Sequence, residues 1–227
     1  MLKICFLDLD GVLVTGAHML ALHERKEKNF QVPDPACVER LNRMLEETGA
    51  WVVVSSSWRM KYVNRNDHEG IRKMLGDLGV QCWTLPDATM TPALRGDRER
   101  GDEIQAWLDE HPRVGQFVIL DDDSDMKHLH TRLVRTTFAK GFEEHHIAEA
   151  KFILSGFGTE LSGWDGEVCK KCFRRNCVGF QVEDRVWQDV TEGKWNVICT
   201  TCFDEEAQKK GIPYVYLATY PMTWRLP

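Results

Sequence analysis

Short runs of apolar residues alternate with amphipathic stretches along the first two-thirds of the chain. The runs at residues 3–9, 51–54 and 117–120 are continuous, which is typical of strands buried on both faces of a parallel sheet. Elsewhere apolar residues recur at helical spacing, and helices are expected from Asp34 to Gly49 and over residues 69–78, 102–110 and 143–154. Strands that alternate with helices predict an α/β fold built on a doubly wound parallel sheet.

The segments outside this pattern are expected to be loops or short strands. Residues 14–33 are polar and irregular, and residues 86–101 carry prolines, glycines and arginines, so both segments are expected to be loops. Short strands are expected at residues 80–85 and 133–134.

The composition changes after residue 156 and divides the chain. Glycines loosen the segment that follows, and five of the eight cysteines lie between Cys169 and Cys202. We therefore expect one domain of residues 1–157 and a second, smaller domain of residues 158–227.

Composition and charge narrow the class of protein. The 227 residues are 43% hydrophobic and 28% charged, which is typical of a soluble globular protein. The formal net charge of -6 shows no basic excess that would indicate a nucleic-acid-binding protein. No apolar run approaches the roughly 20 residues of a membrane span, and the chain enters its first strand directly, without a cleavable signal. A cytoplasmic protein without a membrane partner is expected.

Polar clusters follow three of the predicted strands, at the point where each strand ends. They are Asp8-Leu9-Asp10-Gly11, Ser55-Ser56-Ser57 and Asp121-Asp122-Asp123. In doubly wound sheets ligands bind at the carboxyl ends of the strands. The sequence therefore predicts one site that contains carboxylates and hydroxyls, and carboxylate oxygens are ligands that Mg²⁺ prefers.

These clusters, taken in order, resemble the motifs of the haloacid dehalogenase (HAD) superfamily of phosphohydrolases. Residues 53–59, 100–104 and 118–126 look like a compact bacterial and phage HAD family named for its occurrence in Swiss Army knife RNA-repair proteins. They are also similar to the phosphatase half of phage polynucleotide kinase-phosphatases. The resemblance covers residues 1–155 and implies a HAD-like Rossmannoid fold that hydrolyses phosphomonoesters.

The resemblance assigns roles to matching residues in the first two clusters. It implies that Asp8 is the nucleophile that becomes an aspartyl-phosphate, and that Asp10 is the general acid and base. Ser55 matches the residue that hydrogen-bonds the phosphoryl group. Ser56, directly after it, and Arg59 are candidates to bind the substrate, since a guanidinium can hold an anion bidentately.

The third motif of the family is a lysine or arginine that steadies the nucleophile and the phosphoryl charge. No lysine lies between Lys73 and Lys127, so an arginine must serve. Arg100, which opens a predicted helix, is the best match, and Arg95 and Arg98 are the alternatives.

The fourth motif completes a magnesium site. The resemblance implies that Mg²⁺ is held by Asp8, by the backbone carbonyl of Asp10, and by Asp121 and Asp122. Among the acidic residues after the strand, Asp122 is the best candidate and Asp121 supports it. Asp123 and Asp125 are the alternatives.

The spacing of the motifs bears on the substrate. HAD enzymes that act on small metabolites often close a cap domain over the site. Here the segments between Asp10 and Ser55 and between Ser55 and Arg100 are too short for a large cap. An open site favours a macromolecular phosphate, such as an RNA or DNA end, or a cap supplied by another domain. Together with the resemblance, this makes a nucleic acid end or a nucleotide the expected substrate. The alternatives are a phosphatase of a protein or small metabolite, and a HAD scaffold that binds a partner without turnover.

Four cysteines in the second domain have the spacing of a metal site. Cys169-x2-Cys172 and Cys199-x2-Cys202 supply four thiolates, the ligand set of a structural Zn²⁺. The apolar residues between the two pairs predict short hairpins, so the module resembles a zinc ribbon. Cys177 is a spare that could replace one ligand. The sequence leaves open whether this module contacts nucleic acid, protein or a second subunit.

Overall fold

The computed structural model describes residues 2–29, 32–157, 169–172, 179–215 and 217–219. The chain divides into two compact units, residues 1–160 and 161–227.

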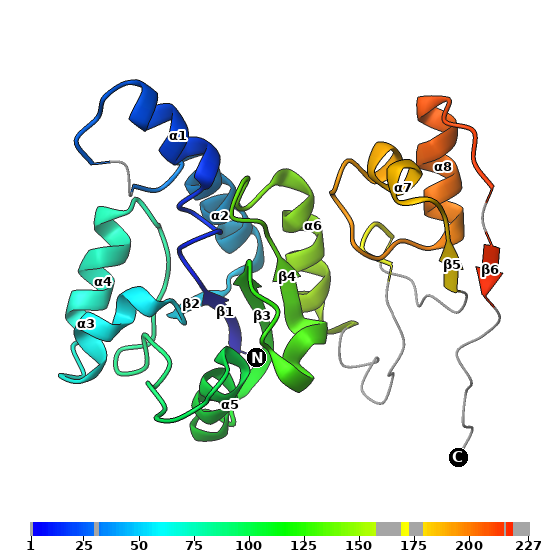
Figure 1. The fold of residues 1–227 in the computed structure, drawn as a ribbon. Helices are drawn as coiled ribbons and strands as arrows, with labels where there is room; N and C mark the ends of the chain where they lie inside the picture. Colours follow the sequence, from blue (N-terminus) through cyan, green and yellow to red (C-terminus); the bar gives the residue numbers. More distant parts are fainter. Residues whose placement is uncertain (1, 30–31, 158–168, 173–178, 216, 220–227) are drawn as a thin grey trace, which may run out of the picture. The chain divides into compact units, whose positions relative to one another are not determined.

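The first unit is built on a four-stranded parallel sheet (Figure 1). Its strands are β1 (Leu2–Leu7), β2 (Trp51–Val54), β3 (Val114–Asp121) and β4 (Leu133–Arg135), in the spatial order β2-β1-β3-β4. Phe6 of β1 lies in register with Val53 of β2 and with Ile119 of β3. The expected α/β fold with a parallel sheet is confirmed.

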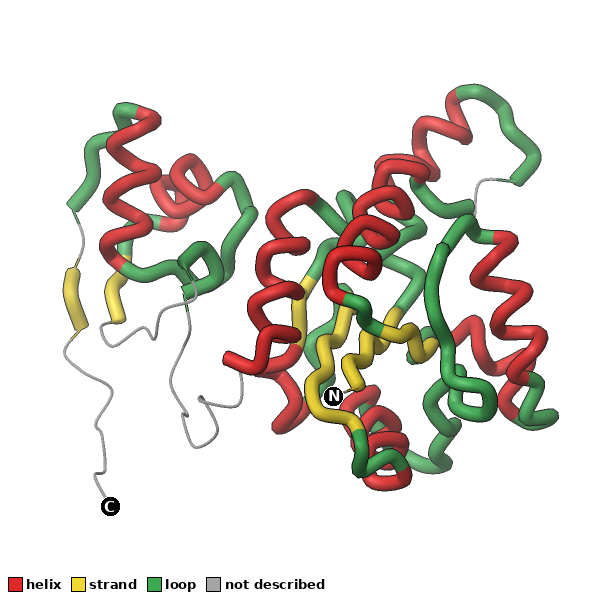
Figure 2. Tube along the Cα trace, turned by 180° about the vertical axis from the view of Figure 1, so that it is seen from behind, coloured by secondary structure: helices red, strands yellow, loops and turns green. Residues whose placement is uncertain are grey.

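Helices cover both faces of this sheet, as Figures 1 and 2 show. The helices of this unit are α1 (Gly16–Glu24), α2 (Pro35–Thr48), α3 (Met60–Val63), α4 (His68–Asp77), α5 (Arg100–Glu110) and α6 (Glu144–Phe152), with the short turns η1 (Ser57–Arg59), η2 (Lys127–Arg132) and η3 (Ile153–Phe157). Neither α1 nor α3 buries a residue.

Alternate residues of β1 face opposite helical layers. Cys5 and Leu7 belong to an apolar cluster with residues of α2, α4 and α6. Ile4 and Phe6 belong to a second cluster with residues of α5 and η2. This alternation is the two-residue period of a pleated strand, and it explains why the strand reads as a continuous apolar run.

Two expectations for the connecting segments of the first unit are wrong in detail. The loop expected at residues 14–33 contains α1, which begins where the Thr15 side chain accepts a hydrogen bond from the His18 N–H at 3.1 Å. No residue of α1 is buried, so its sequence lacks the apolar period that marks a packed helix. The strand expected at residues 80–85 is reduced to one bridge between Trp51 and Trp83.

The helix expected from residue 102 begins earlier, at Arg100. The Glu99 N–H donates to Asp102 Oδ2 at 3.2 Å, and the Asp102 N–H donates to the Glu99 carbonyl at 3.0 Å, so this pair caps the start of the helix. This places Arg100 in the first turn of α5.

The described residues of the second unit form two helices and a small antiparallel sheet. β5 (Gly179–Gln181) pairs with β6 (Leu217–Thr219), and α7 (Asp184–Thr191) and α8 (Thr200–Lys210) lie between them in the sequence. The buried Phe203 of α8 stacks on Trp187 of α7 with ring centroids 5.5 Å apart. The hairpins expected between the cysteine pairs are therefore wrong for residues 184–191. Val186, Trp187 and Val190 follow helical spacing, and β-branched residues were a weaker guide than that period.

Within the residues that the structure describes, no helix is both long enough and apolar enough to cross a bilayer.

Candidate active site

Three polar residues continue one face of the sheet beyond the ends of its strands. Asp8 lies two residues after Phe6, Ser55 two after Val53, and Asp121 two after Ile119. Phe6, Val53 and Ile119 all belong to the cluster that packs against α5. Because side chains alternate along a strand, Asp8, Ser55 and Asp121 share that face, and all three are buried.

Arg100 reaches this face from the first turn of α5. Its Nη1 lies 3.3 Å from Asp8 Oδ1, and its Nε lies 3.8 Å from Asp121 Oδ2. Burial acts to lower the pKa of Arg100, but the nearby Asp8 and Asp121 carboxylates outweigh it and the pKa is raised. The guanidinium is therefore held as a cation between two carboxylates. Arg95 and Arg98, the other arginines considered for this role, are exposed.

Two backbone contacts fix the position of Arg100. The Arg100 N–H donates to Asp125 Oδ2 at 3.0 Å, and the Gly101 N–H donates to the Asp125 carbonyl at 3.1 Å. A Cβ on Gly101 would lie 2.5 Å from the Met126 carbonyl oxygen, so only glycine allows α5 to approach this closely. Asp125, expected as a possible metal ligand, therefore holds the start of α5.

Three carboxylates converge at the carboxyl edge of the sheet. Asp8, Asp121 and Asp122 each offer an oxygen within 4.8 Å of the others. Burial raises the pKa of Asp8 to about 6, and the charges of Asp10 and Asp122 add to this against the opposing effect of Arg100. Burial and the charge of Asp8 raise the pKa of Asp121 to about 7. A divalent cation would relieve this repulsion, and three carboxylates suit a hard cation such as Mg²⁺.

Three buried polar atoms of the site have no hydrogen-bond partner within the described residues, although Arg100 Nη1 and Asp121 Oδ2 take part in the ion pairs given above. Ser55 Oγ, Arg100 Nη1 and Asp121 Oδ2 are buried and make no hydrogen bond. Such atoms are costly in a folded protein unless a ligand satisfies them. A hydroxyl, a guanidinium N–H and a carboxylate oxygen together fit a phosphoryl group with its cation.

Asp10 lies beside these carboxylates, and its own side chain has a different partner. Asp10 Oδ2 accepts a hydrogen bond from Trp58 Nε1 at 2.8 Å. A tight turn follows, in which the N–H groups of Leu13 and Val14 both donate to the Leu9 carbonyl at 2.9 Å. Sequence reasoning gave Trp58 no role, because only the folded chain brings residues 10 and 58 together.

Ser56 and Arg59 serve the turn after β2. Ser56 Oγ accepts from the Trp58 N–H at 3.4 Å and caps η1. Arg59 is buried, and its five N–H groups donate to four backbone carbonyls and to Glu103 Oε2. A guanidinium has five such donors. Arg59 therefore has none left for a substrate anion, and it ties the Ser55 turn to α5 instead of binding the substrate as expected.

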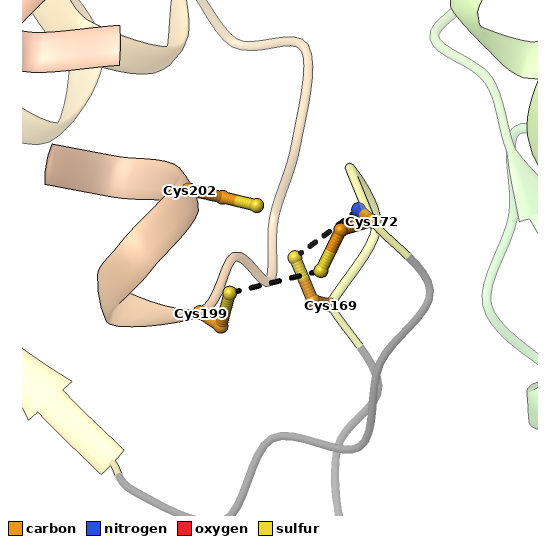
Figure 3. A group of neighbouring side chains, drawn as sticks. All are labelled: Cys169, Cys172, Cys199 and Cys202. Atoms are coloured by element: carbon orange, nitrogen blue, oxygen red, sulfur yellow. Dashed lines mark hydrogen bonds between the residues drawn. The ribbon is translucent and has the colours of Figure 1, made fainter. Parts of the chain in front are cut away.

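The four cysteines of the second unit form a separate cluster. Cys169 and Cys172 lie on a turn, whereas Cys199 caps α8 and Cys202 lies in its first turn (Figure 3). Their sulfur atoms all lie within 4.8 Å of one another, and the Sγ atoms of Cys172 and Cys199 are 3.8 Å apart. Burial and the neighbouring thiols raise the pKa of Cys202. Four thiols at this spacing fit a tetrahedral Zn²⁺. Cys177 lies outside the described residues.

Comparison with known proteins bears on the first unit. A family model described as "HAD domain in Swiss Army Knife RNA repair proteins" matches residues 4–147. No curated protein and no solved structure matches the chain.

Proposed function

The chain belongs to the HAD domains of Swiss Army Knife RNA repair proteins and is a HAD-type phosphatase, and on this premise we propose that it hydrolyses phosphomonoesters through a phosphorylated Asp8. The observation that carries the proposal is the buried Asp8 carboxylate with Arg100 Nη1 at 3.3 Å and Asp121 and Asp122 around it. A buried carboxylate can attack phosphorus when cations offset the charge of the phosphate.

We propose that the cation is Mg²⁺, held by Asp8, Asp121 and Asp122, with the Asp10 backbone carbonyl as a further ligand. When bound, Mg²⁺ supplies positive charge to the phosphoryl oxygens. Arg100 adds a second positive charge beside Asp8, and the Ser55 hydroxyl supplies a donor. These groups hold the phosphoryl oxygens in both steps. In the first step the phosphorus exchanges its leaving oxygen for Asp8, and in the second it exchanges Asp8 for a water oxygen.

In the first step an Asp8 carboxylate oxygen forms a bond to phosphorus. The bond between phosphorus and the leaving oxygen breaks, and its electron pair stays on that oxygen. Asp10, protonated, gives its proton to the leaving oxygen, so the product departs as an alcohol. Asp8 carries the phosphoryl group, and Asp10 is a carboxylate.

In the second step Asp10 accepts a proton from a water molecule. The water oxygen forms a bond to phosphorus, and the bond between phosphorus and Asp8 breaks. Phosphate leaves, Asp8 is again a carboxylate, and Asp10 again carries a proton. Both steps use the same two side chains in complementary roles.

For the substrate we propose a phosphorylated nucleic acid end. The family to which the chain belongs is described by its occurrence in RNA repair proteins. Between residues 11 and 54, the helices in the described residues are α2, which contributes to the core, and α1, none of whose residues is buried. One short exposed helix is too small to close over a metabolite, and a polymer end can approach an open site.

We propose a structural Zn²⁺ for the four cysteines. Four thiolates leave no open coordination position, so a catalytic role is not expected. In the described part of the second unit, the buried apolar cluster is small, and a bound metal would contribute folding free energy to it.

Phosphate release tests this function. The substrates are oligonucleotides with a 3′- or a 5′-phosphate, mononucleotides and an aryl phosphate, each with and without Mg²⁺, and the control variant is Asp8→Asn. Release that requires Mg²⁺ and Asp8 and is fastest for an oligonucleotide end is the expected result. Release from mononucleotides or the aryl phosphate alone would contradict the proposed substrate, and release by Asp8→Asn would contradict the mechanism.

A further inference from the structure

The indole of Trp58 contacts the side chain that the proposed reaction uses as its acid and base. Trp58 Nε1 donates to Asp10 Oδ2 at 2.8 Å. We propose that Trp58 is a positioning residue that holds the Asp10 carboxyl in one orientation for proton transfer. This inference rests on the proposed function, because it gives Trp58 a part in the step that Asp10 performs.

The chemistry of the indole determines what this contact does. The indole N–H is a donor only, so the oxygen that it contacts must act as an acceptor. Asp10 Oδ2 is therefore committed to Trp58 while the contact lasts. The proton that Asp10 gives to the leaving oxygen, and later takes from water, must be carried by Oδ1. Fixing one oxygen also fixes the carboxyl plane, which removes rotations that do not lead to proton transfer.

The turn that carries Trp58 is rigidly held. On one side, Ser56 Oγ accepts from the Trp58 N–H at 3.4 Å. On the other side, Arg59 is buried and bonded through all five of its N–H groups. A donor on such a turn can orient its partner, because the donor itself has little freedom to follow.

The ring of Trp58 is packed, whereas its N–H is directed at Asp10. The side chain is half-buried and packs against the apolar cluster that includes Leu9, Val12 and Ile71. Packing of the ring contributes to stability, and the N–H contributes the orientation of Asp10. A phenylalanine at this position keeps the ring contact and removes only the donor, so Trp58→Phe separates the two contributions.

Two substrates with different leaving groups test the proposal. An aryl phosphate such as p-nitrophenyl phosphate releases a weakly basic phenolate that needs no proton. A nucleoside 3′-phosphate releases an alkoxide that does need one. The quantity to compare is kcat/KM, which reports the steps up to departure of the leaving group.

Trp58→Phe is expected to lower kcat/KM for the nucleoside phosphate about tenfold to a hundredfold, and to change it less than about twofold for the aryl phosphate. An equal fall for both substrates would overturn the proposal, because loss of packing slows both reactions alike. No fall for either substrate would also overturn it. Trp83→Phe is the matched control, since Trp83 is 71% exposed and takes no part in the site; it is expected to leave both values unchanged.

A second measurement is independent of activity. In isotope-labelled protein, the indole N–H resonance of Trp58 is identified by its loss in Trp58→Phe. Asp10→Ala is expected to move this resonance upfield and to speed its exchange with solvent. An unchanged resonance would overturn the contact, and with it the proposal. Failure of the proposed function is distinct from this: it appears as wild-type protein that hydrolyses neither ester, or as an active Asp8→Asn variant.

Discussion

The carboxylate of Asp122 lies against the backbone of Gly11, so closely that a Cβ on Gly11 would be 2.2 Å from Asp122 Cγ. Gly11 also has a φ of +71°, in the left-handed region that favours glycine. The turn after the first strand and the acidic cluster of residues 121–123 thereby fit closely together, and the Asp122 carboxylate lies near those of Asp8 and Asp121.

Gly11→Ala is expected to abolish most Mg²⁺-dependent activity, because the new methyl group displaces Asp122. Gly49→Ala is the matched control: Gly49 has a φ of +66° and nothing within 4 Å of its added Cβ. Each alanine costs about 1–2 kcal/mol of unfolding free energy for its left-handed backbone, but only Gly11→Ala should also weaken Mg²⁺ binding. Denaturant unfolding and titration with Mg²⁺ measure the two effects. Equal Mg²⁺ affinity in both variants would contradict the placement of Asp122.

Arg100→Met is expected to lower kcat about 10²- to 10³-fold, the usual effect of removing one donor that stabilises transition-state charge. Arg98→Met is the control, because Arg98 is exposed and is the neighbouring alternative for the same motif. Arg100→Lys should retain part of the activity, since it keeps the charge and loses the fork of donors. Steady-state kinetics of the three variants with one substrate shows which arginine, Arg100 or Arg98, supports the reaction. A larger loss in Arg98→Met would show that the arginine has been misassigned.

Glu103→Gln is expected to destabilise the first unit by about 3–5 kcal/mol, because it leaves the Arg59 guanidinium buried without its carboxylate. Arg59 is 2% exposed, and its Nη2 pairs with Glu103 Oε2. The control is Asp77→Asn, which breaks the exposed pair with Lys73 and should change stability little. Urea unfolding of both variants measures the difference. If they unfold alike, the buried pair does not hold α5 to the Ser55 turn.

The acidic cluster makes stability depend on pH and on Mg²⁺ together. The pKa is raised in the folded state to about 6 for Asp8 and about 7 for Asp121, so the folded chain binds more protons than the unfolded chain. Without metal, stability should therefore fall as the pH rises from about 4 through these values. Mg²⁺ competes with the protons and should raise the melting temperature more at about pH 8 than at about pH 5. Thermal unfolding with Mg²⁺ or EDTA checks this, and an equal shift at both pH values would count against the site.

The cysteine cluster should contain about one Zn²⁺ per chain. Cys199→Ser is expected to lose most of this metal and to expose the second unit to proteolysis. Cys82→Ser is the control, because Cys82 lies outside the cluster of four. Elemental analysis of purified protein provides the measurement. Metal retained in Cys199→Ser at the wild-type level would argue that this cysteine is not a ligand.

The part of the site that lies on the strands could be predicted from the sequence. Asp8, Ser55 and Asp121 each end a buried run, and in a parallel sheet such ends meet at one edge. The family match over residues 4–147 confirms the family that these residues indicated. Arg100 was predicted as the best match, with Arg95 and Arg98 as alternatives, and the Asp125 contact that places it depends on a loop that no local pattern specifies.

The remaining features depend on tertiary contacts. Arg59 looked like an anion-binding residue because its charge is visible in the sequence, whereas its five internal partners are not. Trp58 lies 48 residues from Asp10, and their hydrogen bond has no local signal. In the second unit, valines and tryptophans were interpreted as strands, but Val186, Trp187 and Val190 follow the amphipathic period of α7, and Trp187 stacks on Phe203.

The most direct test of the central claim is to trap the phosphorylated enzyme. Protein is mixed with Mg²⁺ and a radiolabelled aryl phosphate, quenched in acid and digested, and the labelled peptide is identified. The account predicts label on Asp8, more label in Asp10→Asn because water is then activated poorly, and none in Asp8→Asn. Phosphate release without label on Asp8, or with label on a different residue, would contradict it.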